Sequence, residues 1–158
     1  MKFKWNLLLA VSGGLFGLAT NVHAKFLPDN NLYLEDFRES NGGISEVEFN
    51  DVINKAEAVY KPIIESHGGN LSVYRFWSDS TVNAMAYRDL SEWAVGMYGG
   101  LARRPEITKD GFTMVLCHEI GHHLAGFPFD GGAGRWPANE GNSDYFAALS
   151  CSRNLWLN

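Results

Sequence analysis

The sequence predicts an α+β fold in which a small antiparallel sheet packs against helices. Apolar residues recur at helical spacing after residue 45 and again from about residue 108, and a last helix is predicted over 139–153. Between the first two helices lie three runs rich in β-branched and aromatic residues, bounded by turn-forming residues. The order is therefore helix, sheet, then two helices.

The first 24 residues have the layout of a secretory signal peptide. Lys2 and Lys4 precede an apolar run that ends at Val22-His23-Ala24, with small residues three and one before a cut after Ala24. The run is broken by glycines and is shorter than the roughly 20 residues that span a bilayer, so no lasting membrane anchor is expected. We therefore expect export to the periplasm or the cell exterior.

The mature chain, residues 25–158, is predicted to be one domain with a surface lead-in over 25–44. The lead-in has no sustained periodicity and contains Gly42-Gly43. The whole chain has 13 basic and 18 acidic residues, a formal charge of −5, and the signal peptide contains two lysines and no acid. Because removing it makes the protein more acidic, nucleic acid is not an expected partner.

The first helix is predicted from a capping box, because Ser45 is followed three residues later by Glu48. Pro62 should kink or end this helix. The three strands are predicted over 71–77, 81–88 and 93–98, and the last two are close enough to form an antiparallel hairpin. The next helix should begin at Thr108 or Asp110 and stop at Gly126.

This second helix carries His118-Glu119-Ile120-Gly121-His122. Its two histidines lie one turn apart on one face, about 6 Å from each other, and can bind one tetrahedral zinc ion. Glu119 then lies beside the metal, where it can take a proton from a zinc-bound water whose pKa is lowered to about 7. A buried acid at this position also needs a cation to compensate its charge.

A third ligand must come from outside the motif. A metzincin would need Gly and His where this chain has Ala125 and Pro128. Glu140 and Asp144 lie four residues apart on the last predicted helix, so one can bind the metal while the other hydrogen-bonds a ligand imidazole. Asp130 stays open as an alternative ligand.

The paired motifs at 118–123 and 139–147 resemble those of the gluzincin metallopeptidases, which include the thermolysin-like enzymes. The resemblance covers about residues 70–153. It implies a zincin-like fold and a metalloendopeptidase rather than an exopeptidase, acting on peptides or proteins with one Zn²⁺. It also implies the residue roles: His118, His122 and Glu140 as zinc ligands, Glu119 as the base, and Asp144 as the residue that orients His118.

A second likeness concerns Asn83-Ala84-Met85-Ala86. In one gluzincin branch a similar Asn-Ala segment belongs to the edge strand along which an extended substrate lies, which implies binding by strand addition. Such enzymes usually have a later residue that stabilises the oxyanion. Tyr145, Arg153 and Arg135 are near in sequence, and the choice among them stays open.

Two other functions agree with these residues. One is a zinc-binding or peptide-binding envelope module without catalysis, and the other is a zinc hydrolase of a non-peptide amide. Glu119 favours a hydrolase, because a pure binding site needs no carboxylate beside the water.

The two cysteines, Cys117 and Cys151, predict a disulfide, since an even pair in an exported protein is usually joined. His123 lies about 100° further round the helix than His122, so we expect it to face away from the metal. It should then lie outside the ligand set or at the surface.

Overall fold

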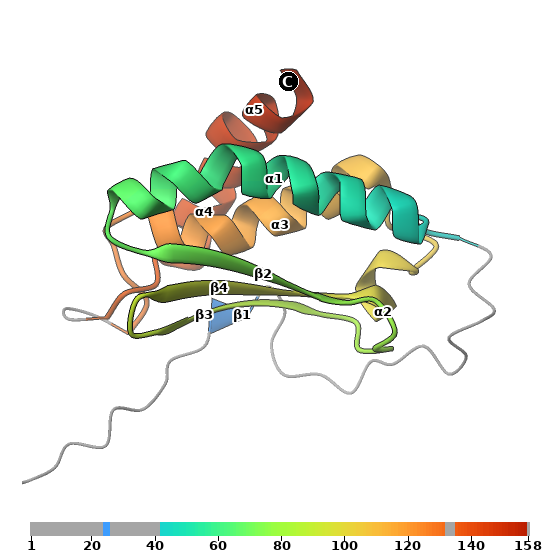
Figure 1. Cartoon of the computed structure of the whole chain (residues 1–158), viewed down its shortest axis with the longest axis horizontal. Coiled ribbons are helices and arrows are strands. Elements are labelled where there is room, and N and C mark those ends of the chain that lie inside the picture. The colour runs from blue at the N-terminus through green and yellow to red at the C-terminus, as the bar shows by residue number, and fades with distance from the viewer. Residues whose placement is uncertain (1–23, 26–41, 132–134, 158) are drawn as a thin grey trace, which may run out of the picture.

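The computed structural model describes residues 24–25, 42–131 and 135–157. In this part of the chain helices cover one face of a small sheet, so the fold is α+β, as predicted (Figure 1). Apart from Ala24, the predicted signal peptide lies outside the described residues, as do residues 26–41 of the predicted lead-in. None of the helices described here is long and apolar enough to cross a bilayer.

Helix α1 (Glu46–Ser66) begins at the predicted capping box. The Ser45 hydroxyl accepts a hydrogen bond from the N–H of Glu48 at 3.3 Å, and the Glu48 carboxylate accepts one from the N–H of Ser45 at 2.9 Å. The helix continues past Pro62, which therefore does not end it. Proline has no N–H, so Pro62 cannot donate the helical hydrogen bond to the carbonyl of Ala58. Both residues are exposed, so this carbonyl lies on the solvent side of the helix.

The sheet is mixed, with the strand order β1-β3-β4-β2. Strands β3 (Ala84–Asp89) and β4 (Glu92–Tyr98) form the predicted antiparallel hairpin. Strand β2 (Asn70–Phe76), however, pairs parallel to β4, so the prediction of a wholly antiparallel sheet was wrong. Strand β2 lies on the far side of β4 from β3, so the chain crosses over between β2 and β3. Side chains alternate in the same way in parallel and antiparallel strands, so the sequence pattern could not distinguish the two pairings.

The fourth strand, β1 (Ala24–Lys25), has two residues and pairs antiparallel with β3 at Ala86 and Met85. The sequence pattern did not predict it. Ile44, at the end of the predicted surface lead-in, is buried, and its N–H donates to the carbonyl of Ala102 at 2.9 Å. The last residue of that segment thus belongs to the core.

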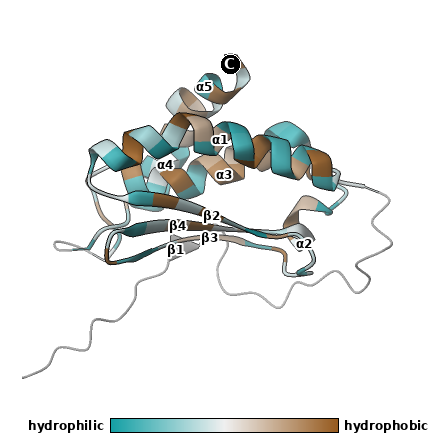
Figure 2. Ribbon diagram, in the orientation of Figure 1, coloured by the Kyte–Doolittle hydropathy of each residue, from teal (hydrophilic) through white to brown (hydrophobic). Residues whose placement is uncertain are grey.

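The hydrophobic core lies between the sheet and the helices. In Figure 2 hydrophobic residues recur among hydrophilic ones along α1, as expected for a helix with one buried face. The ring of Phe49 on α1 lies 5.3 Å from that of Trp77 and 5.1 Å from that of Phe112. These contacts hold the first turns of α1 and α3 (Lys109–Leu124) together next to the end of β2.

Helix α3 begins as predicted at Thr108, whose side chain accepts a hydrogen bond from the N–H of Gly111 at 3.0 Å. It ends before Gly126, which has a φ of 75°. A short helix that was not predicted, α2 (Gly99–Ala102), precedes it.

The last predicted helix is divided into three parts. Helix α4 (Glu140–Phe146) starts at the N-cap Asn139 and is followed by one π-helical segment, η1 (Ala147–Cys151), and by α5 (Ser152–Leu157). Cys151 at the end of η1 forms a disulfide with Cys117 on α3. This bond ties the segment after α4 to the centre of α3.

Replacing Cys117 and Cys151 together with alanine is expected to lower the free energy of unfolding by about 3–4 kcal/mol, because the unfolded chain is no longer closed into a loop. Urea denaturation of the parent and the double variant measures this difference. Thiol labelling of denatured, unreduced, exported protein should find no free thiol. Two labelled thiols would show that the disulfide does not form.

Candidate metal centre

Helix α3 presents His118 and His122 side by side in the interior. Their exposed fractions are 3% and 0%, and their ring centroids lie 4.7 Å apart at an interplanar angle of 87°. Together with Glu119, which is fully buried, they form a group whose possible ligand atoms all lie within 4.8 Å of one another. Imidazole nitrogens and carboxylate oxygens are atoms that bind zinc in proteins, so this buried cluster could hold a metal ion.

Each imidazole is oriented through its Nδ1 atom. The Nδ1 of His118 lies 2.8 Å from Oδ1 of Asp144, and the Nδ1 of His122 lies 2.8 Å from the carbonyl oxygen of Ala138. Ser143 Oγ is also 3.1 Å from the Nδ1 of His122. A proton on Nδ1 leaves the lone pair on Nε2, which is the arrangement of histidines that bind metals.

Glu140 brings a carboxylate to both Nε2 atoms. Its Oε2 lies 3.0 Å from Nε2 of His118, and its Oε1 lies 3.9 Å from Nε2 of His122. Among the described residues, nothing forms a hydrogen bond with the buried Nε2 of His122. A buried nitrogen in this state is unfavourable, and a metal ion between the imidazoles and the carboxylate would satisfy it. The residues present therefore fit a metal ion.

The charges around the site agree with this geometry. Burial lowers the pKa of His122, which keeps the imidazole in the neutral form that a metal requires. Burial raises the pKa of Glu140, while the attraction of His118 opposes this shift. A cation between these groups would favour the ionised carboxylate. The fully buried carboxylate of Glu119 would gain from the same charge.

The approach of α4 to α3 depends on Gly121. A Cβ atom at this position would lie 2.9 Å from Cα of Ser143, closer than real Cβ atoms come, and 3.0 Å from its carbonyl oxygen, which is also a tight contact. Glycine thus allows the two backbones to pass close to each other. The close crossing places Glu140 and Asp144, at the first and second turns of α4, against His118.

Asp130, the alternative third ligand, forms no ion pair with either imidazole among the described residues, although its charge acts on His122 and Glu140. It is exposed, and its backbone N–H donates to the carbonyl of Pro137 at 2.8 Å. Tyr145, Arg135 and Arg153 are exposed as well, and none of the contacts described here selects one of them as the group that stabilises an oxyanion.

His123 does not lie at the surface, which was one of its two expected positions. Only 6% of it is exposed, and its ring stacks against those of Trp93 and Trp136, with centroids 5.6 and 5.0 Å away. Its buried position depends on residues far apart in the sequence, so helical spacing alone could not predict it. It faces the sheet, where its Nε2 lies 3.1 Å from the carbonyl oxygen of Ala94.

The segment expected to bind substrate lies at the start of β3. Asn83 precedes the strand, and Ala84, Met85 and Ala86 belong to it. This strand contacts α3 and so borders the helix that carries the metal motif. It is not a fully open edge, because β1 pairs with it at Met85 and Ala86. A peptide that added to this stretch would have to replace β1.

Two groups at the site were not predicted. The carbonyl of Ala138 and the hydroxyl of Ser143 both orient His122. The role of a backbone carbonyl does not depend on the residue type, so the sequence could not predict the contact of Ala138. Ser143 lies three residues after Glu140 on the same predicted helix, and this spacing could have suggested that it contacts a ligand histidine.

Comparisons of the chain with protein-family models, with curated proteins and with solved structures found no match. The function of the site is therefore argued from its own geometry and chemistry.

Gly121→Ala is expected to push α4 away from α3. The crowding should lower the free energy of unfolding by about 1–3 kcal/mol and weaken metal binding by roughly 10–100-fold, because Glu140 and Asp144 move with α4. Gly111→Ala is the matched control on the same helix, since an added Cβ there meets only Thr108 Oγ1 at 3.3 Å. Thermal unfolding and zinc titration test both. Equal effects of the two substitutions would contradict the role given to the crossing.

Glu140→Ala is expected to lose a bound metal, whereas Asp130→Ala should retain it. Only the first removes a carboxylate within reach of both imidazoles. Elemental analysis of the purified variants after dialysis measures the metal content. Retention by both, or loss from both, would show that Glu140 is not the distinguishing ligand.

Proposed function

We propose that this chain is an exported, zinc-dependent peptidase of the gluzincin type, with His118, His122 and Glu140 as the zinc ligands. The observation that carries the proposal is the position of the Glu140 carboxylate, 3.0 and 3.9 Å from the two Nε2 atoms of histidines that also group with the buried Glu119. The contact between Asp144 and His118, at 2.8 Å, supports it further.

Two imidazoles and one carboxylate are the ligand set of many catalytic zinc sites, which keep a fourth position open. A structural zinc site usually has four protein ligands, mostly thiolates and imidazoles, and both cysteines here are joined to each other. The donor set therefore favours a catalytic ion. When bound, zinc would lower the pKa of a coordinated water to about 7 and polarise a carbonyl.

Glu119 is the residue of this chain best placed to move protons. Its carboxylate belongs to the group of possible ligand atoms that all lie within 4.8 Å of one another with those of His118 and His122, so it stays beside the metal position. Its carboxylate would accept a proton from the attacking water and then donate it to the leaving amine. We assign the third ligand position to Glu140, because its carboxylate lies 3.0 Å from Nε2 of His118 and 3.9 Å from Nε2 of His122.

The substrate would be a peptide or protein that binds in an extended form along β3. Strand addition uses the backbone groups of an outer strand and sets the direction of the bound chain. Strand β1 pairs antiparallel with Met85 and Ala86, so this stretch of β3, which contacts α3, already accepts an added strand. A substrate that paired in the same way would lie beside the helix that carries Glu119.

Glu119→Gln keeps the size of the side chain but removes the base. The variant should retain about one zinc per chain and fold normally, while cleavage of any susceptible peptide should fall by at least about 100-fold. Asp130→Asn is the matched control, since it removes an exposed acid near the same site. A broad peptide library with mass-spectrometric detection, together with zinc analysis, measures both properties.

Unchanged cleavage by Glu119→Gln would show that Glu119 is not the base. If the parent binds zinc but cleaves nothing in the library, a zinc-binding or peptide-binding module, or a hydrolase of another amide, replaces the peptidase proposal.

A further inference from the structure

A second site-like feature is a cavity of about 400 Å³ beside the C-terminal end of α3. It is lined by Arg88 from β3, by Arg135 from the loop between α3 and α4, and by His67 at the C-cap of α1. Its apolar wall includes Phe129 and Trp136, and no carboxylate is among the residues found to line it. A cavity lined only by basic and neutral groups is notable in a chain whose formal charge is −5.

The Arg88 guanidinium is held in one orientation. Its Nη2 donates to the carbonyl oxygen of His123 at 2.9 Å, and its Nε donates to Nδ1 of the same residue at 3.2 Å. Its Cζ lies 3.4 Å from the ring centroid of Trp93 and 4.9 Å from that of Trp136. These bonds use two of the five N–H groups of an arginine, so donors remain on a side chain that is already ordered.

The charge of Arg88 has no carboxylate partner in the described part of the chain, where the ion pairs involve other residues. Its side chain is partly buried, and this burial lowers the pKa of Arg88 to about 10. Taking a cation out of water is unfavourable unless an anion or a set of acceptors replaces the lost solvation. An anionic ligand would supply this compensation.

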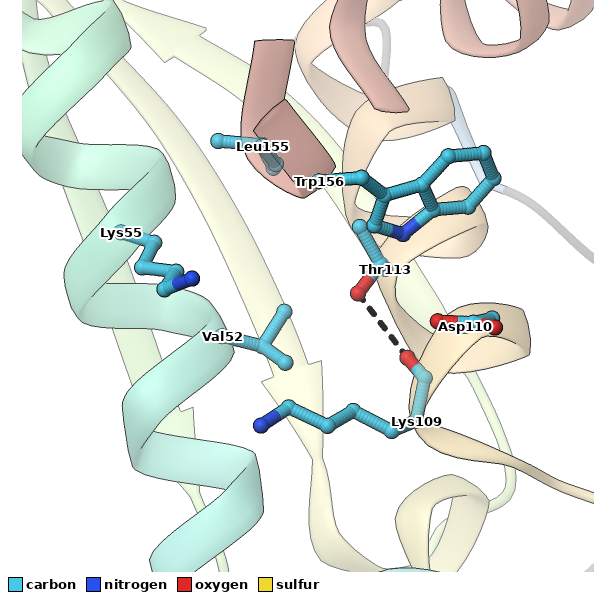
Figure 3. Close-up of a pocket in the computed structure, with 7 residues that line it drawn as sticks. All are labelled: Val52, Lys55, Lys109, Asp110, Thr113, Leu155 and Trp156. Atoms are coloured by element: carbon cyan, nitrogen blue, oxygen red, sulfur yellow. Dashed lines mark hydrogen bonds between the residues drawn. The ribbon is translucent and has the colours of Figure 1, made fainter. Parts of the chain in front are cut away.

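The other cavity described, of about 340 Å³, lies between α1, the start of α3 and α5 (Figure 3). Its cations are Lys55 and Lys109, whose long side chains point into the space from two helices, and its lining includes the acid Asp110. A mixed set of charges on flexible side chains gives no preference for an anion. The comparison favours the cavity at Arg88.

We propose that the cavity between Arg88 and Arg135 binds an oxyanion, a carboxylate or a phosphate. The planar guanidinium group can donate two parallel hydrogen bonds to either anion, and the fixed orientation of Arg88 reduces the entropy lost on binding. Phe129 and Trp136 would contact an apolar group attached to the anion. This inference does not depend on the proposed peptidase activity.

The cavity and the metal centre share one loop. Arg135 and Trp136 lie just before Ala138, whose carbonyl orients His122. An anion held by Arg135 would therefore restrain the segment that orients a metal-binding imidazole. Zinc binding and anion binding are measured in separate experiments. A negative result for zinc therefore does not count against the anion site, and a negative result for the anion does not count against the metal site.

The test is a titration of the full, exported chain with inorganic phosphate, followed by tryptophan fluorescence, because Trp93 and Trp136 adjoin Arg88. Arg135→Gln should weaken binding about tenfold, the loss expected for one charge-assisted hydrogen bond. Arg153→Gln is the matched control, since it removes the same charge from an exposed position on α5. The control should bind phosphate as the parent does.

Arg88→Gln should abolish binding, and Arg88→Lys, which keeps the charge but loses the planar fork, should bind weakly. If the Arg88 variants do not fold, Arg135→Gln still decides the proposal, because Arg135 is exposed. A short peptide with a free C-terminal carboxylate is titrated beside its amidated form. Preference for the free form assigns the site to peptide ends, and binding of phosphate alone assigns it to free phosphate; either supports the oxyanion site.

Each titration is repeated with a neutral chelator that carries no carboxylate or phosphate group, because a metal ion held by His118 and His122 could itself bind an oxyanion, and a carboxylate chelator would compete for the cavity. Binding that survives the chelator and depends on Arg135 supports the proposal. Three results would overturn it: no saturable binding of either anion, binding that the chelator removes, or equal weakening by Arg135→Gln and Arg153→Gln.

Discussion

At the crossing of α3 and α4, the backbone of Gly121 lies so close to Ser143 that a methyl group has no room. The positions of both downstream acids depend on this contact. Glu140 lies at the start of α4 and Asp144 one turn later, so a shift of α4 by the width of one carbon atom would move both carboxylates away from His118 together. The geometry of the candidate site thus depends on a van der Waals contact between two helices.

Helix α3 is held along its length by three different interactions. Near its start, Phe112 packs in the core against Phe49 of α1. Near its centre, Cys117 is joined to Cys151. At its C-terminal end, His123 contacts Arg88 on β3 and stacks on the neighbouring tryptophans. The candidate metal ligands His118 and His122 lie between these points, so their imidazoles are positioned before any ligand binds.

Features that depend on neighbours in the chain were predicted from the sequence. The capping box at Ser45, the start of α3 at Thr108 and the antiparallel hairpin each involve residues within a few positions of one another. Helical spacing predicted that one of Glu140 and Asp144 contacts a ligand imidazole, and the resemblance to the gluzincins implied that Asp144 contacts His118, as it does in the structure.

Apart from the disulfide, which followed from the presence of just two cysteines, most features that depend on distant segments were not predicted. The parallel pairing of β2 with β4 and the addition of β1 to β3 leave no signal in the alternation of residues. The burial of His123 requires Arg88 and Trp136, which approach it only in the folded chain. The bond from His122 to Ala138 uses a backbone carbonyl, for which any residue at 138 would serve in principle.

The π-helical segment η1 changes the direction in which the end of the chain faces. Each residue of an α-helix turns the side chains by about 100°, and a π segment corresponds to one residue inserted into that progression. Within η1, Ala147 and Cys151 are buried, and further on Leu155 is buried and Asn154 contacts Tyr60 of α1. Deleting one residue from η1 would rotate everything after it by about 100°, which would turn Cys151 away from Cys117 and α5 away from α1. The length of this segment is therefore under a stricter constraint than the identity of its exposed residues.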